Sequence, residues 1–201
     1  MGLLLPMQAE AQHHHHHHHP HDHDFDYDWD PSPSGYLWGF RPYLSYNGSL
    51  ILKAPPSGYR SSIGSIHMAE IGTNLHIIPW FFVGVGLGYE FYHRRLAEND
   101  RLTYLNLRRH SMFLSEQIGI CITFSDSYLR FFWGPQQAMT VGSNFNEGPS
   151  ERFFFHWGAQ WSYGVGGFGI QFRNPTRATQ YSDNSLYFNG LVVSLTLFIG
   201  F

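Results

Sequence analysis

The chain has 201 residues, about the length of one domain, and only 13% of them are charged, against roughly 25% in ordinary soluble domains. Aromatic residues make up 18% and there are 21 Gly, while the formal net charge is −3. These values exclude several classes. The chain has no run of about 18 apolar residues, so no transmembrane helix is predicted. The balance of 12 bases and 9 acids over residues 34–201 excludes a nucleic-acid partner. The single Cys121 excludes an internal disulfide.

The first 35 residues have the features of an export leader rather than of a folded domain. Residues 1–11 resemble the end of a secretory signal, with a short apolar piece before the A-x-A-like site Ala9-Glu10-Ala11. Residues 12–35 are low in complexity, with a run of His, then Asp at every second position, then a linker rich in Pro and Ser. We expect a signal-peptide remnant over 1–11 and a disordered His/Asp-rich leader over 12–35.

The leader also holds the candidate metal ligands. Neutral imidazoles at high local density bind Zn, Ni or Cu, and carboxylates add oxygen ligands. Three interpretations stay open: a metal-capturing tail, an engineered affinity tag, and a natural low-complexity leader without a selected role. No other cofactor is expected. The candidate ligands are His13, His14, His15, His16, His17, His18, His19, His21, His23, Asp22 and Asp24.

From Tyr36 onward the sequence predicts eight strands, over 36–46, 62–78, 80–95, 104–124, 127–141, 152–163, 165–174 and 185–201. Long polar connectors alternate with short ones at Pro79, Asp126 and near Gly164. Long outer loops and short periplasmic turns are typical of bacterial barrels, which have an even number of strands. The predicted fold class is therefore all-β, an eight-stranded antiparallel up-and-down transmembrane β-barrel over residues 36–201.

The last strand indicates where such a barrel would reside. Large apolar residues occupy every second position from Leu191 to Phe201, and the positions between them are mostly small or weakly polar. A membrane barrel turns its apolar face outward to lipid and its small and polar residues inward. The same alternation recurs in most strands, although it places Glu116 outward unless a bulge near Ser115 shifts the register.

This pattern, clearest over 74–92 and 185–201, resembles the small eight-stranded outer-membrane β-barrel-domain families, with the architecture of the OmpA membrane domain and OmpX. The terminal Phe201 also resembles the C-terminal signal of Gram-negative outer-membrane barrels. The resemblance implies a porin-like barrel in the cell outer membrane, surrounded by outer-membrane lipid, with both termini periplasmic.

Charged side chains that point inward on this alternation form a predicted lumen charge network. The interior of an eight-stranded barrel is just wide enough to be filled by side chains, and buried charges there must be paired. We expect an internal Glu–Arg plug that holds the register. A gate, a proton or ion path, or a catalytic Glu–His pair is the alternative. The network residues are Arg41, Glu70, Glu90, Arg130, His156 and Arg173.

No catalytic motif can be identified in the chain. Lipid A deacylase barrels carry a His-x-Ser-Asn-Ala segment at the outer end of a late strand, where this chain reads Asn174-Pro175-Thr176-Arg177-Ala178. Asn cannot accept a nucleophile's proton as His does. His110 and Ser111 are adjacent on a strand, so their side chains point to opposite faces. We therefore expect no catalytic residues.

The sequence favours a non-enzymatic outer-membrane barrel with a structural or interaction role, and its protein partner would contact the outer loops or the periplasmic leader. Two alternatives stay open. One is a lipid A-modifying hydrolase-type barrel that has lost or altered its catalytic residues. The other is periplasmic metal binding or delivery through the His/Asp tail.

Overall fold

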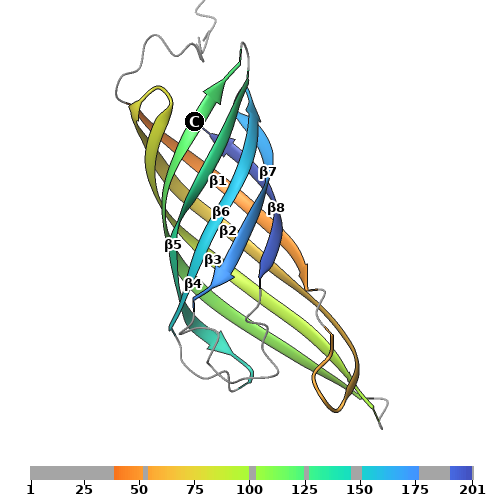
Figure 1. Ribbon diagram of the computed structural model, residues 1–201. Helices are drawn as coiled ribbons and strands as arrows, with labels where there is room; N and C mark the ends of the chain where they lie inside the picture. The colour runs from red at the N-terminus through yellow and green to blue at the C-terminus, as the bar shows by residue number, and fades with distance from the viewer. Residues whose placement is uncertain are drawn as a thin grey trace, which may run out of the picture. The chain divides into compact units, whose positions relative to one another are not determined.

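The computed structural model describes residues 39–51, 54–99, 103–124, 127–145, 151–176 and 191–200. Every neighbouring pair of strands is antiparallel, and the last strand pairs back with the first, so that eight strands close into a barrel (Figure 1). No helix in this described part of the chain is long and apolar enough to cross a membrane. The strands are β1 (Gly39–Ile51), β2 (Tyr59–Ile78), β3 (Phe81–Glu98), β4 (Tyr104–Thr123), β5 (Ser127–Ser143), β6 (Glu151–Tyr163), β7 (Gly166–Pro175) and β8 (Val192–Gly200).

The two ends of the barrel differ. At one end, here the turn end, Pro79 and Trp80 join β2 to β3, and Gly164 and Val165 join β6 to β7. Gly164 has a φ of 55°, in the left-handed region that favours glycine. At the other end, here the loop end, β2, β3 and β4 project beyond the rest of the ring (Figure 1, lower right). These three strands have 20, 18 and 20 residues, whereas β7 and β8 have only 10 and 9.

The register fixes how strongly the strands tilt. Starting at Gly39 on β1 and moving from each residue to its paired neighbour on the next strand, one reaches Ser194 on β8. The residue after Ser194, Leu195, pairs with Gly48 on β1. The ring therefore returns to β1 about ten residues further toward the loop end, a stagger that goes with a strand tilt of about 40° in a barrel of this size.

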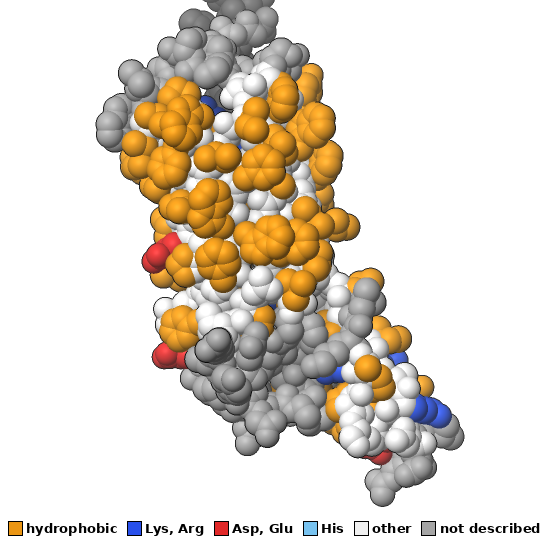
Figure 2. Space-filling model, in the orientation of Figure 1, with side chains coloured by type: hydrophobic (Ala, Val, Ile, Leu, Met, Phe, Trp, Pro, Cys, Tyr) orange, Lys and Arg blue, Asp and Glu red, His pale blue; other side chains and the backbone are white. Residues whose placement is uncertain are grey.

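Side chains alternate between the two faces of the barrel wall. On β8, Leu195 and Leu197 are exposed, whereas Ser194 and Thr196 are buried. Apolar side chains cover the outer wall over most of its height (Figure 2). The predicted all-β fold of eight antiparallel strands is confirmed. Residues 36–38 and 185–190 of the first and last predicted strands lie outside the described residues.

The first connector is shorter than predicted, because β1 continues to Ile51 and β2 begins at Tyr59. Asn47 and Ser49 are typical turn formers, yet both face inward and are buried. The Thr196 hydroxyl donates to Oδ1 of Asn47 at 2.5 Å, and the Ser49 hydroxyl donates to a β2 carbonyl at 3.4 Å. A polar barrel interior accepts such side chains within a strand, so turn-forming composition did not end β1.

A bulge near Ser115, the alternative to an outward Glu116, is not found in the described ladder between β4 and β5. Ser115 pairs with Gln136 and Ile118 with Trp133 in one register, and the register shift lies at His110 and Ser111 instead. Glu116 therefore keeps its outward parity and is exposed on the apolar wall.

Candidate functional site

The candidate site is the barrel interior, which inward side chains fill in three layers. Nearest the turn end, Phe82, Cys121 and Phe132 form a buried apolar cluster. The guanidinium carbon of Arg130 lies 4.5 Å from the centre of the Phe82 ring and 5.5 Å from that of Phe198. Aromatic faces attract a guanidinium by cation–π interaction, so Arg130 is held in this layer by rings rather than by a carboxylate.

Glu70 is the centre of the middle layer. The hydroxyl groups of Tyr43 and Ser115 both donate to Oε1 of Glu70, at 2.6 and 2.5 Å. Nε2 of Gln117 donates in turn to the Tyr43 hydroxyl at 2.9 Å. Hydrogen bonds to a carboxylate are about twice as strong as neutral ones, so hydroxyl groups of β1 and β4 fix a side chain of β2.

Glycine on β3 makes room for this layer. A methyl group at Gly86 would overlap Oε1 of Glu70 and lie 2.7 Å from the Tyr43 hydroxyl, and one at Gly88 would overlap the Phe113 ring. The alternating glycines of β3 therefore leave the space that inward side chains of neighbouring strands occupy.

A small polar cavity remains in the middle layer. Its lining includes Tyr43, Glu70, Arg130, His156 and Gln160, and about 10 Å³ of it is open to the centre of a water molecule. That volume holds about one water. The middle layer therefore offers a site for a single solvent molecule rather than a channel.

His156 replaces a hydrogen bond that the sheet loses at Pro135. Pro135 lies in the gap of the β4–β5 ladder opposite Glu116 and has no backbone N–H to donate. Nε2 of His156 donates to the Glu116 carbonyl instead, at 3.0 Å, across Gly134, where any side chain would overlap that carbonyl. Nδ1 of His156 accepts from Gln171 at 3.3 Å. His156 therefore has a structural role in the sheet.

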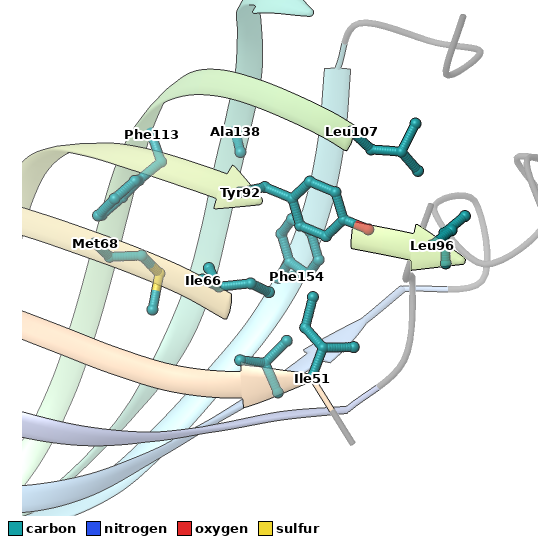
Figure 3. Packing of buried hydrophobic residues seen from close by; sticks show 10 residues of the cluster. Ile51, Ile66, Met68, Tyr92, Leu96, Leu107, Phe113, Ala138 and Phe154 are labelled. Atoms are coloured by element: carbon teal, nitrogen blue, oxygen red, sulfur yellow. The ribbon is translucent and has the colours of Figure 1, made fainter. Parts of the chain in front are cut away.

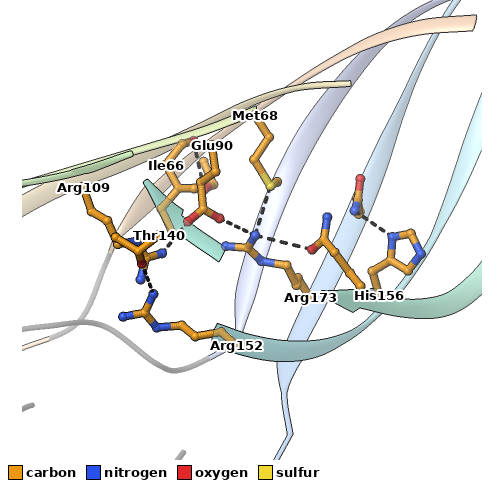
Figure 4. A network of polar contacts seen from close by, with 11 residues as sticks. Ile66, Met68, Glu90, Arg109, Thr140, Arg152, His156 and Arg173 are labelled. Atoms are coloured by element: carbon orange, nitrogen blue, oxygen red, sulfur yellow. Dashed lines mark hydrogen bonds and ion pairs between the residues drawn. The ribbon is translucent and has the colours of Figure 1, made fainter. Parts of the chain in front are cut away.

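The layer nearest the loop end holds the ion pairs. Both carboxylate oxygens of Glu90 are paired, one with Arg109 and one with Arg173, and all three side chains are at most 1% exposed (Figure 4). Arg173 also donates to Oε1 of Gln136 at 3.4 Å. Nearby, Arg152 donates to the Thr140 hydroxyl at 2.9 Å. Glu90 thus joins β3 to its neighbour β4 and, across the interior, to β7.

An apolar cluster also packs at the loop end (Figure 3). The rings of Phe154 and Tyr92 in this cluster lie beside the guanidinium groups of Arg173 and Arg109. The members of the cluster come from every strand except β7 and are all buried. The expectation of a polar interior is therefore incomplete, because this half of the barrel is sealed by an apolar cluster. Its members are Ile51, Ile66, Met68, Tyr92, Leu96, Leu107, Phe113, Ala138, Phe154 and Val192.

The six predicted network residues do not form one network. Glu90 and Arg173 meet directly, whereas Glu70, Arg130 and His156 line the small cavity. Arg41, at the turn end of β1, is half-buried. The sequence interpretation missed Arg109, although the alternation of β4 turns it inward, and the same parity turns Arg94 of β3 inward. No hydrogen bond between Glu70 and His156 is found among the described residues.

The candidate metal ligands of the leader all lie outside the described residues. Within the described ranges, no three His, Cys, Asp or Glu side chains are grouped so as to hold a metal ion.

The outer wall carries a second polar feature, at the edge of its apolar surface toward the loop end. His67, Phe91 and His110 lie side by side across β2, β3 and β4. Nδ1 of His67 is 2.5 Å from the Tyr46 hydroxyl, and its Nε2 is 3.0 Å from the Ser65 hydroxyl. Nδ1 of His110 is bonded in the same way to the Tyr89 hydroxyl. We call these six residues the Tyr–His belt.

The described part of the segment compared with deacylase barrels, residues 174–176, contains no paired His and Ser side chains. Asn174 and Thr176 are half-buried at the loop end of β7, and the Thr176 backbone donates to the Phe153 carbonyl at 2.9 Å. His110 faces outward and Ser111 is buried inside, so the two do not meet.

Fold and site together define a closed all-β barrel with a filled interior and an apolar outer wall. No protein-family model matches the chain, and no curated protein matches it either.

Proposed function

We propose that the chain is an outer-membrane barrel protein with a structural or interaction role, and that it is not a pore. The observation that carries this proposal is the reversal of polarity between the two faces of the wall. Leu195 and Leu197 are 73% and 63% exposed, whereas Arg109 and Arg173 are at most 1% exposed. In water, this apolar surface would stay hydrated at a cost in free energy, whereas lipid acyl chains around the barrel would cover it.

The height of the apolar wall supports a membrane location. Phe81 and Phe91 mark its two edges on β3 and lie ten residues apart. At about 3.3 Å per residue and a tilt of about 40°, this spacing corresponds to a band about 25 Å tall. Outer-membrane barrels have an apolar band of about that height. The Tyr–His belt at one edge matches the aromatic girdles that such barrels place at the interface.

The orientation follows from the two ends of the barrel. Short turns face the periplasm and long loops the outside in bacterial barrels. The loop end would then be external and both chain termini periplasmic. The ends of β2, β3 and β4 project beyond the rest of the ring (Figure 1), and we assign the interaction role to them.

The test is gel mobility of the chain refolded in detergent, with and without residues 12–33. A closed barrel stays compact in the unheated sample and unfolds on boiling, so both chains should shift on heating and both should float with vesicles in a density gradient. Zn or Ni titration of the same two chains tests metal capture by the leader. A chain that does not shift on heating and stays out of the vesicle fraction would refute the membrane barrel.

One observation favours a second candidate function, hydrolysis of an acyl ester in a lipid. Ser65, His67 and Tyr46 form a chain of hydrogen bonds on the outer wall. With Nδ1–H of His67 donating to Tyr46, Nε2 can take the Ser65 proton while Oγ attacks an ester carbonyl carbon. The alcohol leaves with that proton, and water then releases the fatty acid from Ser65 and restores its hydroxyl.

Release of fatty acid from phosphatidylcholine vesicles tests this second function. Ser65→Ala and His67→Ala should abolish the release, while Ser61→Ala, an exposed serine on the same strand, should leave it unchanged. Release that survives Ser65→Ala, or the absence of release from the unaltered barrel, would exclude the hydrolase.

A further inference from the structure

Basic side chains gather on the outer wall just beyond the Tyr–His belt. His93 and Arg95 project outward from β3, and Arg108 projects outward from β4 directly opposite His93. Arg95 is the diagonal neighbour of Arg108, a relation that puts their Cβ atoms about 7–8 Å apart. We call these three residues the cationic patch. Both arginines are exposed, and His93 stacks on the Phe91 ring.

The charge of the cationic patch is not neutralised by the described residues around it. The guanidinium carbon of Arg95 lies 3.8 Å from the centre of the Tyr104 ring, a stacking contact that leaves its N–H groups free to donate. Among the described carboxylates, Glu98 accepts from the Thr103 hydroxyl at 2.9 Å, and Glu151 is on β6, two strands away from β4. The described ion pairs involve Glu90 inside the barrel and neither arginine of the patch.

The height of the patch points to a ligand anchored in lipid. His93 and Arg95 lie two and four residues beyond Phe91, the edge of the apolar band. At about 3.3 Å per residue and a tilt of about 40°, they stand about 5 and 10 Å above that edge. Lipid headgroups occupy a layer about 5–8 Å thick on each side of the hydrocarbon core. His93, with Arg108 opposite it, is therefore level with headgroup phosphates, and Arg95 lies just outside that layer.

We propose that the cationic patch binds the phosphate of a phosphorylated lipid in the outer leaflet, with the acyl chains of that lipid on the apolar wall below Phe91. Guanidinium groups pair with phosphate oxygens through two parallel N–H donors. Tyr104 and Arg108 flank Asn106, the partner of Arg95, on opposite sides, so a rotation of the Arg95 side chain from Tyr104 toward Arg108 lets the two arginines hold one phosphate between them. Continuity of the patch with the apolar wall favours a lipid over free phosphate. This inference rests on the proposed membrane location.

Native mass spectrometry of the full chain in zwitterionic detergent tests the inference. Phosphatidic acid and phosphatidylcholine with the same acyl chains serve as probes, and each variant is first checked for heat-dependent gel mobility. The barrel should retain phosphatidic acid preferentially. The double variant Arg95→Gln/Arg108→Gln should lower its retention by about thirtyfold, which corresponds to about 1 kcal/mol for each of two arginines at a membrane surface. Arg60→Gln, which removes an exposed charge of β2 outside the patch, should leave retention unchanged.

Four outcomes would overturn the inference. A barrel that shifts on heating but shows no preference for phosphatidic acid overturns it and leaves the membrane barrel standing. An equal loss in Arg60→Gln would mean that overall charge, and not the patch, holds the lipid. Displacement of the lipid by an equal concentration of inorganic phosphate would refute the lipid assignment. A chain that shows no shift at all would refute both the proposed membrane barrel and this inference.

Discussion

At the residue scale, the carboxyl group of Glu116 is the side chain least suited to its surroundings. It is exposed on the outer wall, between Leu114 and Ile118, and its partner across the ladder is Val85. Val85 lies near the middle of the band from Phe81 to Phe91, so Glu116 is close to the height where a charge is most costly in a bilayer. Its backbone carbonyl, by contrast, is satisfied by His156.

Replacing Glu116 by Leu should therefore raise the free energy of unfolding in phosphatidylcholine vesicles, by about 1–2 kcal/mol, somewhat less than the effect of a mid-bilayer Arg or Lys. Urea titration of the reconstituted barrel measures the change. Glu151→Leu is the matched control, because Glu151 begins β6 at the loop end, beyond the band. A loss of stability in Glu116→Leu would show instead that the carboxylate has a binding partner.

The buried pair formed by Glu90 gives the opposite expectation. Glu90→Ala leaves the guanidinium groups of Arg109 and Arg173 buried without their carboxylate, which costs about 3–5 kcal/mol. Glu98→Ala removes only a half-buried carboxylate near the end of β3 and should stay within about 0.5 kcal/mol. Denaturant unfolding in the same detergent compares the two variants. Equal losses would contradict the assignment of Glu90 as a stabilising link between β3, β4 and β7.

At the element scale, the proposed membrane location requires each strand to present one face to lipid, and β8 illustrates this requirement most simply. Leu195→Arg should cost about 2–4 kcal/mol in bilayers, because it places a charge on the apolar face within the hydrocarbon region. Leu50→Arg, near the loop end of β1 and equally exposed at 73%, should cost about 0–1 kcal/mol. The difference is read from refolding titrations in vesicles. A neutral Leu195→Arg would mean that β8 does not face lipid.

The same alternation explains how much of the fold could be predicted. A period of two is visible in the residues themselves, so the strands, their order and the faces of Leu195, Glu90 and Arg173 follow from it. The extension of β1 through Asn47 and Ser49 could not be predicted, because turn-forming residues also suit a polar interior. The pairing of Glu90 with Arg109 and Arg173 depends on the stagger between strands far apart in sequence, which no single strand encodes. The inward position of Arg109, by contrast, can be predicted from the alternation of β4.

At the scale of the whole barrel, the interior reads as a plug with three levels. Rings hold Arg130 near the turn end, hydroxyl groups hold Glu70 in the middle, and Glu90 holds two arginines near the loop end. Each level joins strands that are not neighbours in sequence, so the plug and the closure of the ring stabilise each other. In such a barrel the interior side chains bind one another and stabilise the fold, so other molecules can contact only the outer wall and the loop end.

This filling predicts that the barrel does not conduct ions. The cavity of the middle layer holds about one water, and the apolar cluster from Ile51 to Val192 seals the loop-end half. In planar bilayers, the reconstituted chain should therefore leave the current at baseline over a range of voltages. Phe113→Ala together with Phe154→Ala removes two rings of that cluster and should at most destabilise the barrel, because the ion pairs of Glu90 remain beside them. Discrete current steps from the unaltered chain would show that the interior opens, and the plug would then be a gate.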